Sequence, residues 1–315
     1  DQKDGDLLEV SEIRSRAYSS SGVAREQDIV TYADELKTQI IEAKHILNSQ
    51  IDSNGNVKIS EIDIYSGASI AAQDGAITFT GLMEHQRIDT SLFDARGNAL
   101  EQEMEKTYYA VNGVTVIGSE TQAIVNAAFS IHDRTNLSTI KNYEGTGASK
   151  IFTDIQVINY TLYDRYGNAE HQTIDTFNDV DMPAASLVSH KDITNDYTSV
   201  TGTIDIQLAD GTVITRPDTF ARKRGSAIET VSIETSRSGV LIQKNVTTTS
   251  LFDVRGNAID QSTDKFVADS LGAEKLATRT AIHNVGINAR GDAARQEITT
   301  ETTDDTGVVT PLEVS

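Results

Sequence analysis

The residues best suited to holding a metal ion lie in a short polar stretch between positions 50 and 61. The candidate ligands, whose carboxylate and amide oxygens are of the kind that Ca²⁺ prefers, are Asp52, Asn54, Asn56 and Glu61. Against a calcium loop, Gln50 stands where an EF-hand carries its first carboxylate, and the segment that follows resembles a strand instead of an exiting helix. We therefore expect a hairpin turn without a cofactor, with a calcium site as the alternative.

The side chains that could perform catalysis form no recognisable motif. The chain has no cysteine, and no metal-ligand spacing joins its six histidines, which are His45, His85, His132, His171, His190 and His283. It also contains no HExxH, GxSxG or phosphate-binding loop, and no GxGxxG after a strand. We therefore predict that the protein is not an enzyme.

Exposed aromatic rings could bind a carbohydrate, and four tyrosines are the candidates for such a platform. They are Tyr108, Tyr109, Tyr163 and Tyr166. The alternative is that these rings pack within strands, where tyrosine is common.

One sequence motif, which we call the word, recurs along the chain: a glycine, one residue, an alanine, two residues and a glutamine. It occurs five times, at residues 22–27, 97–102, 167–172, 256–261 and 291–296. Recurrence at long intervals indicates a repeat architecture. The word therefore favours a structural role for the protein over a single catalytic site.

The residues before the glycine predict the structure of each repeat. In three copies an aspartate precedes the glycine by three positions, which is the preference of a type I turn that closes a hairpin. These pairs are Asp94 with Gly97, Asp164 with Gly167, and Asp253 with Gly256, and the corresponding glycines of the outer copies are Gly22 and Gly291. Weaker turns are expected at Asp52–Gly55, at Asp133–Asn136 with asparagine in the glycine position, and at Asp210–Gly211.

The spacing of the turns predicts a mainly β fold. Intervals of about 40 residues, with segments rich in β-branched and aromatic residues on both sides, indicate antiparallel hairpin repeats that form an extended or stacked sheet. One exception is expected between Ile29 and Leu47, where apolar residues alternate at intervals of four and three, the spacing of an amphipathic helix. We predict a partial repeat plus this helix in residues 1–50, and hairpin repeats in residues 51–182 and 183–315.

Composition limits the partners. The 315 residues carry 47 acidic and 27 basic side chains, and the formal net charge of −20 argues against nucleic acid as a partner. No apolar run is long enough for a membrane span. The first residues are neither a signal peptide nor an initiator methionine, so we expect a processed or excised piece of a longer protein.

The turn residues resemble a known family. Leu162-Tyr-Asp-Arg-Tyr-Gly-Asn168 is similar to the YD-type hairpin repeats of large bacterial surface and toxin-shell proteins, the Rhs class. Phe93-Asp94 and Phe252-Asp253 are conservative variants of the same motif. The likeness covers the turns alone, because the family has a basic residue after the glycine and a unit of about half this length. It implies a spiralling β-sheet that acts as a shell, stalk or adhesive fibre.

Three functions are open at this point. The first is a non-enzymatic extracellular or cell-surface structural protein, a subunit or segment of a fibre, surface layer or stalk. Its strand edges would join copies of itself or adjacent repeats of a longer chain. The second is an adhesin or carbohydrate-binding module on the same scaffold. The third is a propeller-type glycosidase built of about eight 40-residue blades.

Overall fold

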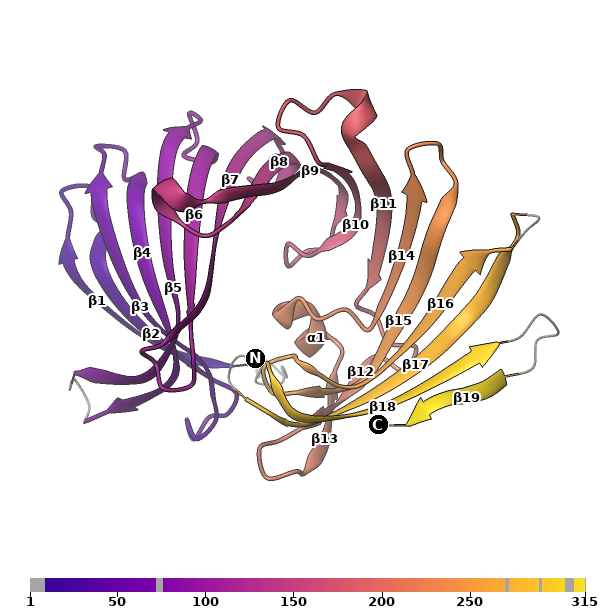
Figure 1. The fold of residues 1–315 in the computed structure, drawn as a ribbon. Coiled ribbons are helices and arrows are strands. Elements are labelled where there is room, and N and C mark those ends of the chain that lie inside the picture. The colour runs from indigo at the N-terminus through magenta and orange to yellow at the C-terminus, as the bar shows by residue number, and fades with distance from the viewer. Residues whose placement is uncertain (1–8, 72–75, 270–271, 289–290, 304–308, 315) are drawn as a thin grey trace. The chain divides into compact units, whose positions relative to one another are not determined.

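The computed structural model describes residues 9–71, 76–269, 272–288, 291–303 and 309–314 (Figure 1). The chain divides into two compact units. Glu9–Ile158 and Thr176–Ser186 form what we call the N-terminal unit. Asn159–Asp175 and Leu187–Ser315 belong to the C-terminal unit. The described part is mainly β, as predicted.

The N-terminal unit is an antiparallel meander in which each strand pairs with the next, from β1 to β8. Its strands are β1 (Val10–Tyr18), β2 (Ala24–Tyr32), β3 (Ile40–Ile51), β4 (Val57–Ile70), β5 (Ile77–Phe93), β6 (Ala99–Tyr109), β7 (Val116–Phe129) and β8 (Thr135–Glu144). Two 3-10 turns, η1 (Gly147–Ser149) and η2 (Ala184–Ser186), also belong to it, and β9 (Ile151–Tyr163) leads out of it. This uninterrupted ladder differs from the separate four-stranded blades of a propeller.

The C-terminal unit continues the hairpin pattern but contains an insertion. Its strands are the end of β9, β10 (Ala169–Phe177), β11 (Leu187–Asp196), β14 (Glu229–Ser236), β15 (Leu241–Asp253), β16 (Ala258–Ala268), β17 (Glu274–Ile287), β18 (Ala293–Thr303) and β19 (Val309–Val314). Strand β11 pairs with β14, and the ladder then runs in chain order to β19. Between β11 and β14, residues 197–228 form the hairpin β12 (Thr203–Gln207) and β13 (Val213–Pro217), followed by the helix α1 (Thr219–Arg224).

The predicted aspartate–glycine turns are present. In the turn Asp94–Gly97 the glycine N–H donates to the Asp94 carbonyl at 3.1 Å, and Gly97 has φ 88°. The Asp94 carboxylate accepts the backbone N–H groups of Arg96 and Asn98 and the Asn98 side-chain amide at 2.8–3.0 Å. Glycine is favoured here because other residues rarely adopt positive φ. The turns beginning at Asp52, Asp164 and Asp253 repeat this arrangement.

One of the weaker turns was placed incorrectly from sequence, and another lies outside the repeat. At Asp133–Asn136, the positive φ of 58° belongs to Asp133, and Asn136 lies within β8. Gly211 does close the β12–β13 hairpin, but the equivalent of the other turn glycines in this region is Gly225, the left-handed C-cap of α1. The segment Gly225-Ser-Ala-Ile-Glu-Thr230 repeats the glycine and alanine of the word. The word, with its substitutions, therefore begins at eight positions: 22, 55, 97, 133, 167, 225, 256 and 291.

The alanine and glutamine of the word have roles in joining hairpins. The Asn48 side-chain amide donates to the Ala24 carbonyl of the preceding hairpin at 3.0 Å, and its carbonyl oxygen accepts Ser60 Oγ from the next strand at 2.9 Å. The same two contacts recur around Asn126, Asn195 and Asn284, where the second donors are Ser138, Thr230 and Gln296. The last position of the word therefore supplies a cross-strand hydrogen bond. The word is thus a structural motif that stabilises the sheet.

Neighbouring turns also contact each other. A Cβ placed on Gly97 would lie 2.8 Å from Oδ1 of Asn56, the residue that follows the glycine of the preceding turn. Gly291 stands in the same relation to Asn257, at 3.0 Å, and Gly225 to Asn168, at 3.3 Å. We call this succession of contacts the turn row. Its glycines are needed for positive φ and for close approach of the neighbouring asparagine.

The helix predicted between Ile29 and Leu47 is wrong. These residues form the end of β2, a loop and most of β3. The carboxylate of Asp34 holds the loop by accepting the backbone N–H groups of Thr38 and Gln39. Val30, Tyr32 and Ala43 are buried together, with Tyr65 and Phe79 packed against them. Pairing of β-branched segments with neighbouring strands therefore outweighed the helical spacing.

The turn carboxylates make stability dependent on pH. Backbone and side-chain hydrogen bonds from Asn98 lower the pKa of Asp94 below its usual value, and those from Asn56 do the same for Asp52. Because the folded-state pKa is the lower one, this stabilisation is present above the unfolded pKa of about 4 and is lost as pH falls through the folded value. We expect the stability difference between the wild-type protein and Asp94→Asn to shrink as pH falls from 6 to 2 in urea unfolding. A difference independent of pH would contradict this.

Candidate functional site

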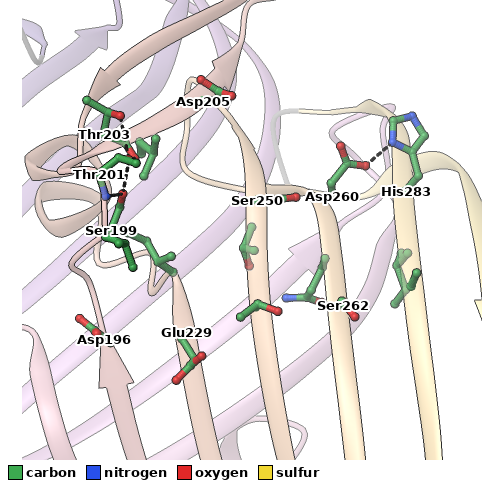
Figure 2. Close-up of a pocket in the computed structure, with 18 of the residues that line it drawn as sticks. Asp196, Ser199, Thr201, Thr203, Asp205, Glu229, Ser250, Asp260, Ser262 and His283 are labelled. Carbon is green, nitrogen blue, oxygen red and sulfur yellow. Dashed lines mark hydrogen bonds and ion pairs between the residues drawn. The ribbon is translucent and has the colours of Figure 1, made fainter.

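The insertion in the C-terminal unit creates a large cleft. The cleft has a volume of about 840 Å³ and lies between residues 198–205 of the insertion and the strands β14 to β18 (Figure 2). A regular hairpin turn between β11 and β14 would leave no such wall. The cleft therefore lies where the repeat is interrupted, which makes it the candidate site.

The insertion is held in place by buried side chains. Ile204 and Ile206 of β12 are 7% and 1% exposed, and Phe220 of α1 is 5% exposed. Strand β12 also pairs in parallel with the end of β15, where Ile206 lies opposite Phe252. Strand β12 and helix α1 are thus part of the packed core of the unit, and they anchor the mostly exposed residues 198–203 of the wall.

The side chains that line the cleft are mainly hydroxyls and carboxylates. The insertion contributes three hydroxyls in a chain, in which Ser199 lies 2.8 Å from Thr201, and Thr201 lies 3.1 Å from Thr203 (Figure 2). The strands contribute further polar groups, which include Glu229, Thr248, Ser250, Asp260, Ser262, His283 and Glu297. These groups can donate and accept hydrogen bonds with a polyhydroxylated ligand.

Among the residues that line the cleft, His283 and Asp260 make the contact that most resembles catalytic machinery. Nδ1 of His283 lies 2.5 Å from Oδ1 of Asp260, and the two residues are directly opposed on β17 and β16 (Figure 2). Within the part of the chain that the structure describes, no hydroxyl is hydrogen-bonded to Nε2 of this histidine.

The same histidine–aspartate contact recurs elsewhere in the sheet. His45 with Asp28, and His85 with Asp63, are directly opposed pairs with Nδ1–Oδ1 distances of 2.7 Å. His190–Asp175 and His171–Asp192 add two more contacts, between β10 and β11. The remaining histidine, His132, lies exposed in the turn Ser130–Asp133. Repetition at five places in the sheet, all between neighbouring strands, favours cross-strand structural pairs.

Two of these pairs allow a matched test of the structural role. Asp28 is 2% exposed and also accepts Arg16, whereas the Asp63 side chain is 30% exposed. We expect Asp28→Asn to lower the free energy of unfolding by about 2–3 kcal/mol, because it weakens two hydrogen bonds to a buried carboxylate. For Asp63→Asn we expect less than about 1 kcal/mol, since water screens an exposed pair. Equal losses in urea unfolding would contradict the assignment.

The candidate calcium ligands Asp52, Asn54, Asn56 and Glu61 take part in hydrogen bonds of the turn or in an ion pair. The Asp52 carboxylate accepts the backbone N–H groups of Asn54 and Asn56 and the Asn56 amide, as in the other turns. Glu61 lies on β4 and pairs with Arg87 at 2.9 Å. Over residues 9–71, 76–269, 272–288, 291–303 and 309–314, no three His, Asp or Glu side chains are grouped so that they could hold a metal ion.

The candidate tyrosines belong to two different units. Tyr108 and Tyr109 end β6 of the N-terminal unit, whereas Tyr163 and Tyr166 lie beside the Asp164 turn of the C-terminal unit. The Tyr108 hydroxyl donates to Glu120 at 2.9 Å, and burial together with this contact raises the pKa of Tyr108. Tyr166 is 40% exposed and carries the Arg165 guanidinium over its ring.

The cleft residues gave no signal in the sequence. Ser199, Thr201 and Thr203 are common residue types in this threonine-rich chain. The interval between the turn glycines Gly167 and Gly225 could have indicated the insertion, because it is longer than the others. Gly211 concealed it, since a hairpin turn inside the insertion has the same local chemistry as a turn of the repeat.

No helix in the described residues is both long enough and apolar enough to cross a membrane. Comparison of the sequence with models of known protein families, and with curated proteins, gives no match.

Proposed function

We propose that this chain is a non-enzymatic structural protein, a subunit or segment of an extracellular fibre, surface layer or stalk. The observation that carries the proposal is the contact between successive hairpins. Each asparagine bonds the hairpin before it and the second strand of its own hairpin, as Asn126 does with Ala99 and Ser138. Units completed by their neighbours suit an assembly that grows by addition of like units.

The strand edges are the proposed joining surfaces. In the N-terminal unit, β2 is the only described strand that pairs with β1, and in the C-terminal unit β18 is the only one that pairs with β19. Unpaired edge groups are templates for another strand. The partners are copies of this chain or adjacent repeats of a longer one.

Light scattering over a range of concentrations tests this proposal, with negative-stain electron microscopy of the same samples. We expect the mean mass to rise with concentration, and elongated particles to form. A single monomeric species at the highest concentration would overturn the proposal. Repeating the measurement in 1 M salt controls for non-specific charge effects, because surface charge is screened there.

The cleft favours a second candidate function, an adhesin or carbohydrate-binding module on the same scaffold. Its hydroxyls and carboxylates could hydrogen-bond the hydroxyl groups of a saccharide. Binding on a glycan array that is lost in Ser250→Trp, which fills the cleft, and kept in Tyr109→Ala would support this site. Loss in Tyr109→Ala alone would instead support the tyrosine platform.

A further inference from the structure

The first strand has an edge that is regular over a short and well-defined length. Strand β1 pairs with β2 without a break from Val10 to Arg16, and it contains no proline. The ladder then skips Ala17, whose φ of 53° interrupts the strand. Figure 1 shows β1 as the outermost strand of this ladder. Within the N-terminal unit, β2 is the only described strand that pairs with these seven regular residues, which are centred on Ile13.

The side chains of this stretch alternate between the two faces of the sheet. Ile13 is 59% exposed although it lies opposite Ile29 of β2. On the other face, Glu12 and Arg14 are linked by an ion pair of 2.9 Å, and they retain 24% and 18% of their side-chain exposure. An apolar residue and two opposite charges therefore surround the centre of the strand.

An antiparallel pair of two β1 strands can adopt few registers. If two Ile13 residues are opposed, Glu12 of each copy lies opposite Arg14 of the other, and Ser11 lies opposite Ser15. A shift of the centre to Arg14 or to Glu12 sets like charges opposite each other, which is destabilising. A shift of the register by one residue pairs each residue with one whose side chain lies on the opposite face of the sheet. One register alone thus satisfies charge, apolar contact and length.

We propose that two copies of this chain associate through β1, in antiparallel pairing centred on Ile13. The partner is a second copy, and the two-fold interface is self-complementary. It continues the sheet from one copy into the other, with Ile29 and Ile13 of each copy in one apolar row. This inference rests on the proposed self-association and specifies which edge is used and in which register.

Single-cysteine variants test the register, because the natural chain has no cysteine. Directly opposed residues have Cα atoms about 4.5–5.5 Å apart, within the range of a disulfide. We expect Ile13→Cys to form a covalent dimer under mild oxidation. Ser15→Cys is the matched control on the same face, since its two copies would be offset by four residues, or about 14 Å, and should not cross-link.

A second variant measures the interface without a cross-link. Ile13→Lys places two like charges at the centre, and we expect the dissociation constant measured by light scattering to rise at least about 10-fold. Val125→Lys is the control, because Val125 is 50% exposed on β7, a strand paired on both sides. Circular dichroism of both variants shows whether they are folded.

The outcomes separate this inference from the proposed function. Cross-linking at Ile13→Cys but not at Ser15→Cys supports the β1 interface. Self-association of the wild type that persists in Ile13→Lys, without cross-linking at position 13, overturns the β1 interface and leaves the proposed function intact. Wild-type protein that stays monomeric throughout overturns both.

Discussion

Replacing Phe220 with alanine is expected to lower the free energy of unfolding of the C-terminal unit by about 3–5 kcal/mol. Phe220 lies on the only α-helix among the described residues and is 5% exposed. The Arg224 guanidinium covers its ring at 4.7 Å. Removing the ring would leave a cavity in the segment that forms one wall of the cleft.

The measurement is urea unfolding followed by far-ultraviolet circular dichroism. Val213→Ala is the matched control, because Val213 belongs to the same insertion and is 51% exposed. Its expected effect is within about 0.5 kcal/mol. If Phe220→Ala also cost less than 1 kcal/mol, the insertion would be a peripheral attachment, and the cleft would lose its rigid wall.

The second large effect is expected at Gly256. Gly256→Ala forces an alanine to φ 89°, which costs about 1–2 kcal/mol, and the new Cβ would lie 2.9 Å from the Arg224 Cβ and against Ser226 Oγ. Crowding of this kind costs a further 1–3 kcal/mol or so. We therefore expect a total loss of about 2–5 kcal/mol in urea unfolding.

Gly211→Ala separates the two causes. Gly211 has φ 86°, in the same unit, and nothing within 4 Å of its would-be Cβ. The expected loss is the conformational part alone, about 1–2 kcal/mol. Equal losses at the two glycines would show that contact between neighbouring turns contributes nothing at Gly256.

The fold class was predictable from sequence because its signals are local. Asp94 and Gly97 lie within four residues, and the hydrogen bonds of the turn join groups of the same short segment. The helix between Ile29 and Leu47 was wrong because its spacing was also a local signal. There, strand pairing and burial of Val30 and Ala43, which depend on neighbouring strands, decided the outcome.

The cleft could not be predicted, because its residues come together only through the insertion. Thr201 and Ser250 are far apart in sequence, and neither carries a recognisable motif. The histidine–aspartate pairs likewise depend on register, as in the 17-residue separation of Asp28 and His45. Without pairing of strands, no sequence rule selects those partners.

By itself the sequence determined where most turns lie and that strands join them, because the φ of a glycine and the hydrogen bonds of an aspartate are fixed within a few residues. Only the tertiary structure decided that Gly225 is the true member of the turn row and that residues 197–228 cover the sheet. The contacts responsible, such as that between Asn168 and the Arg222 carbonyl, span 54 residues. Over such distances the packing of the folded chain selects the partner, and local residue preferences do not.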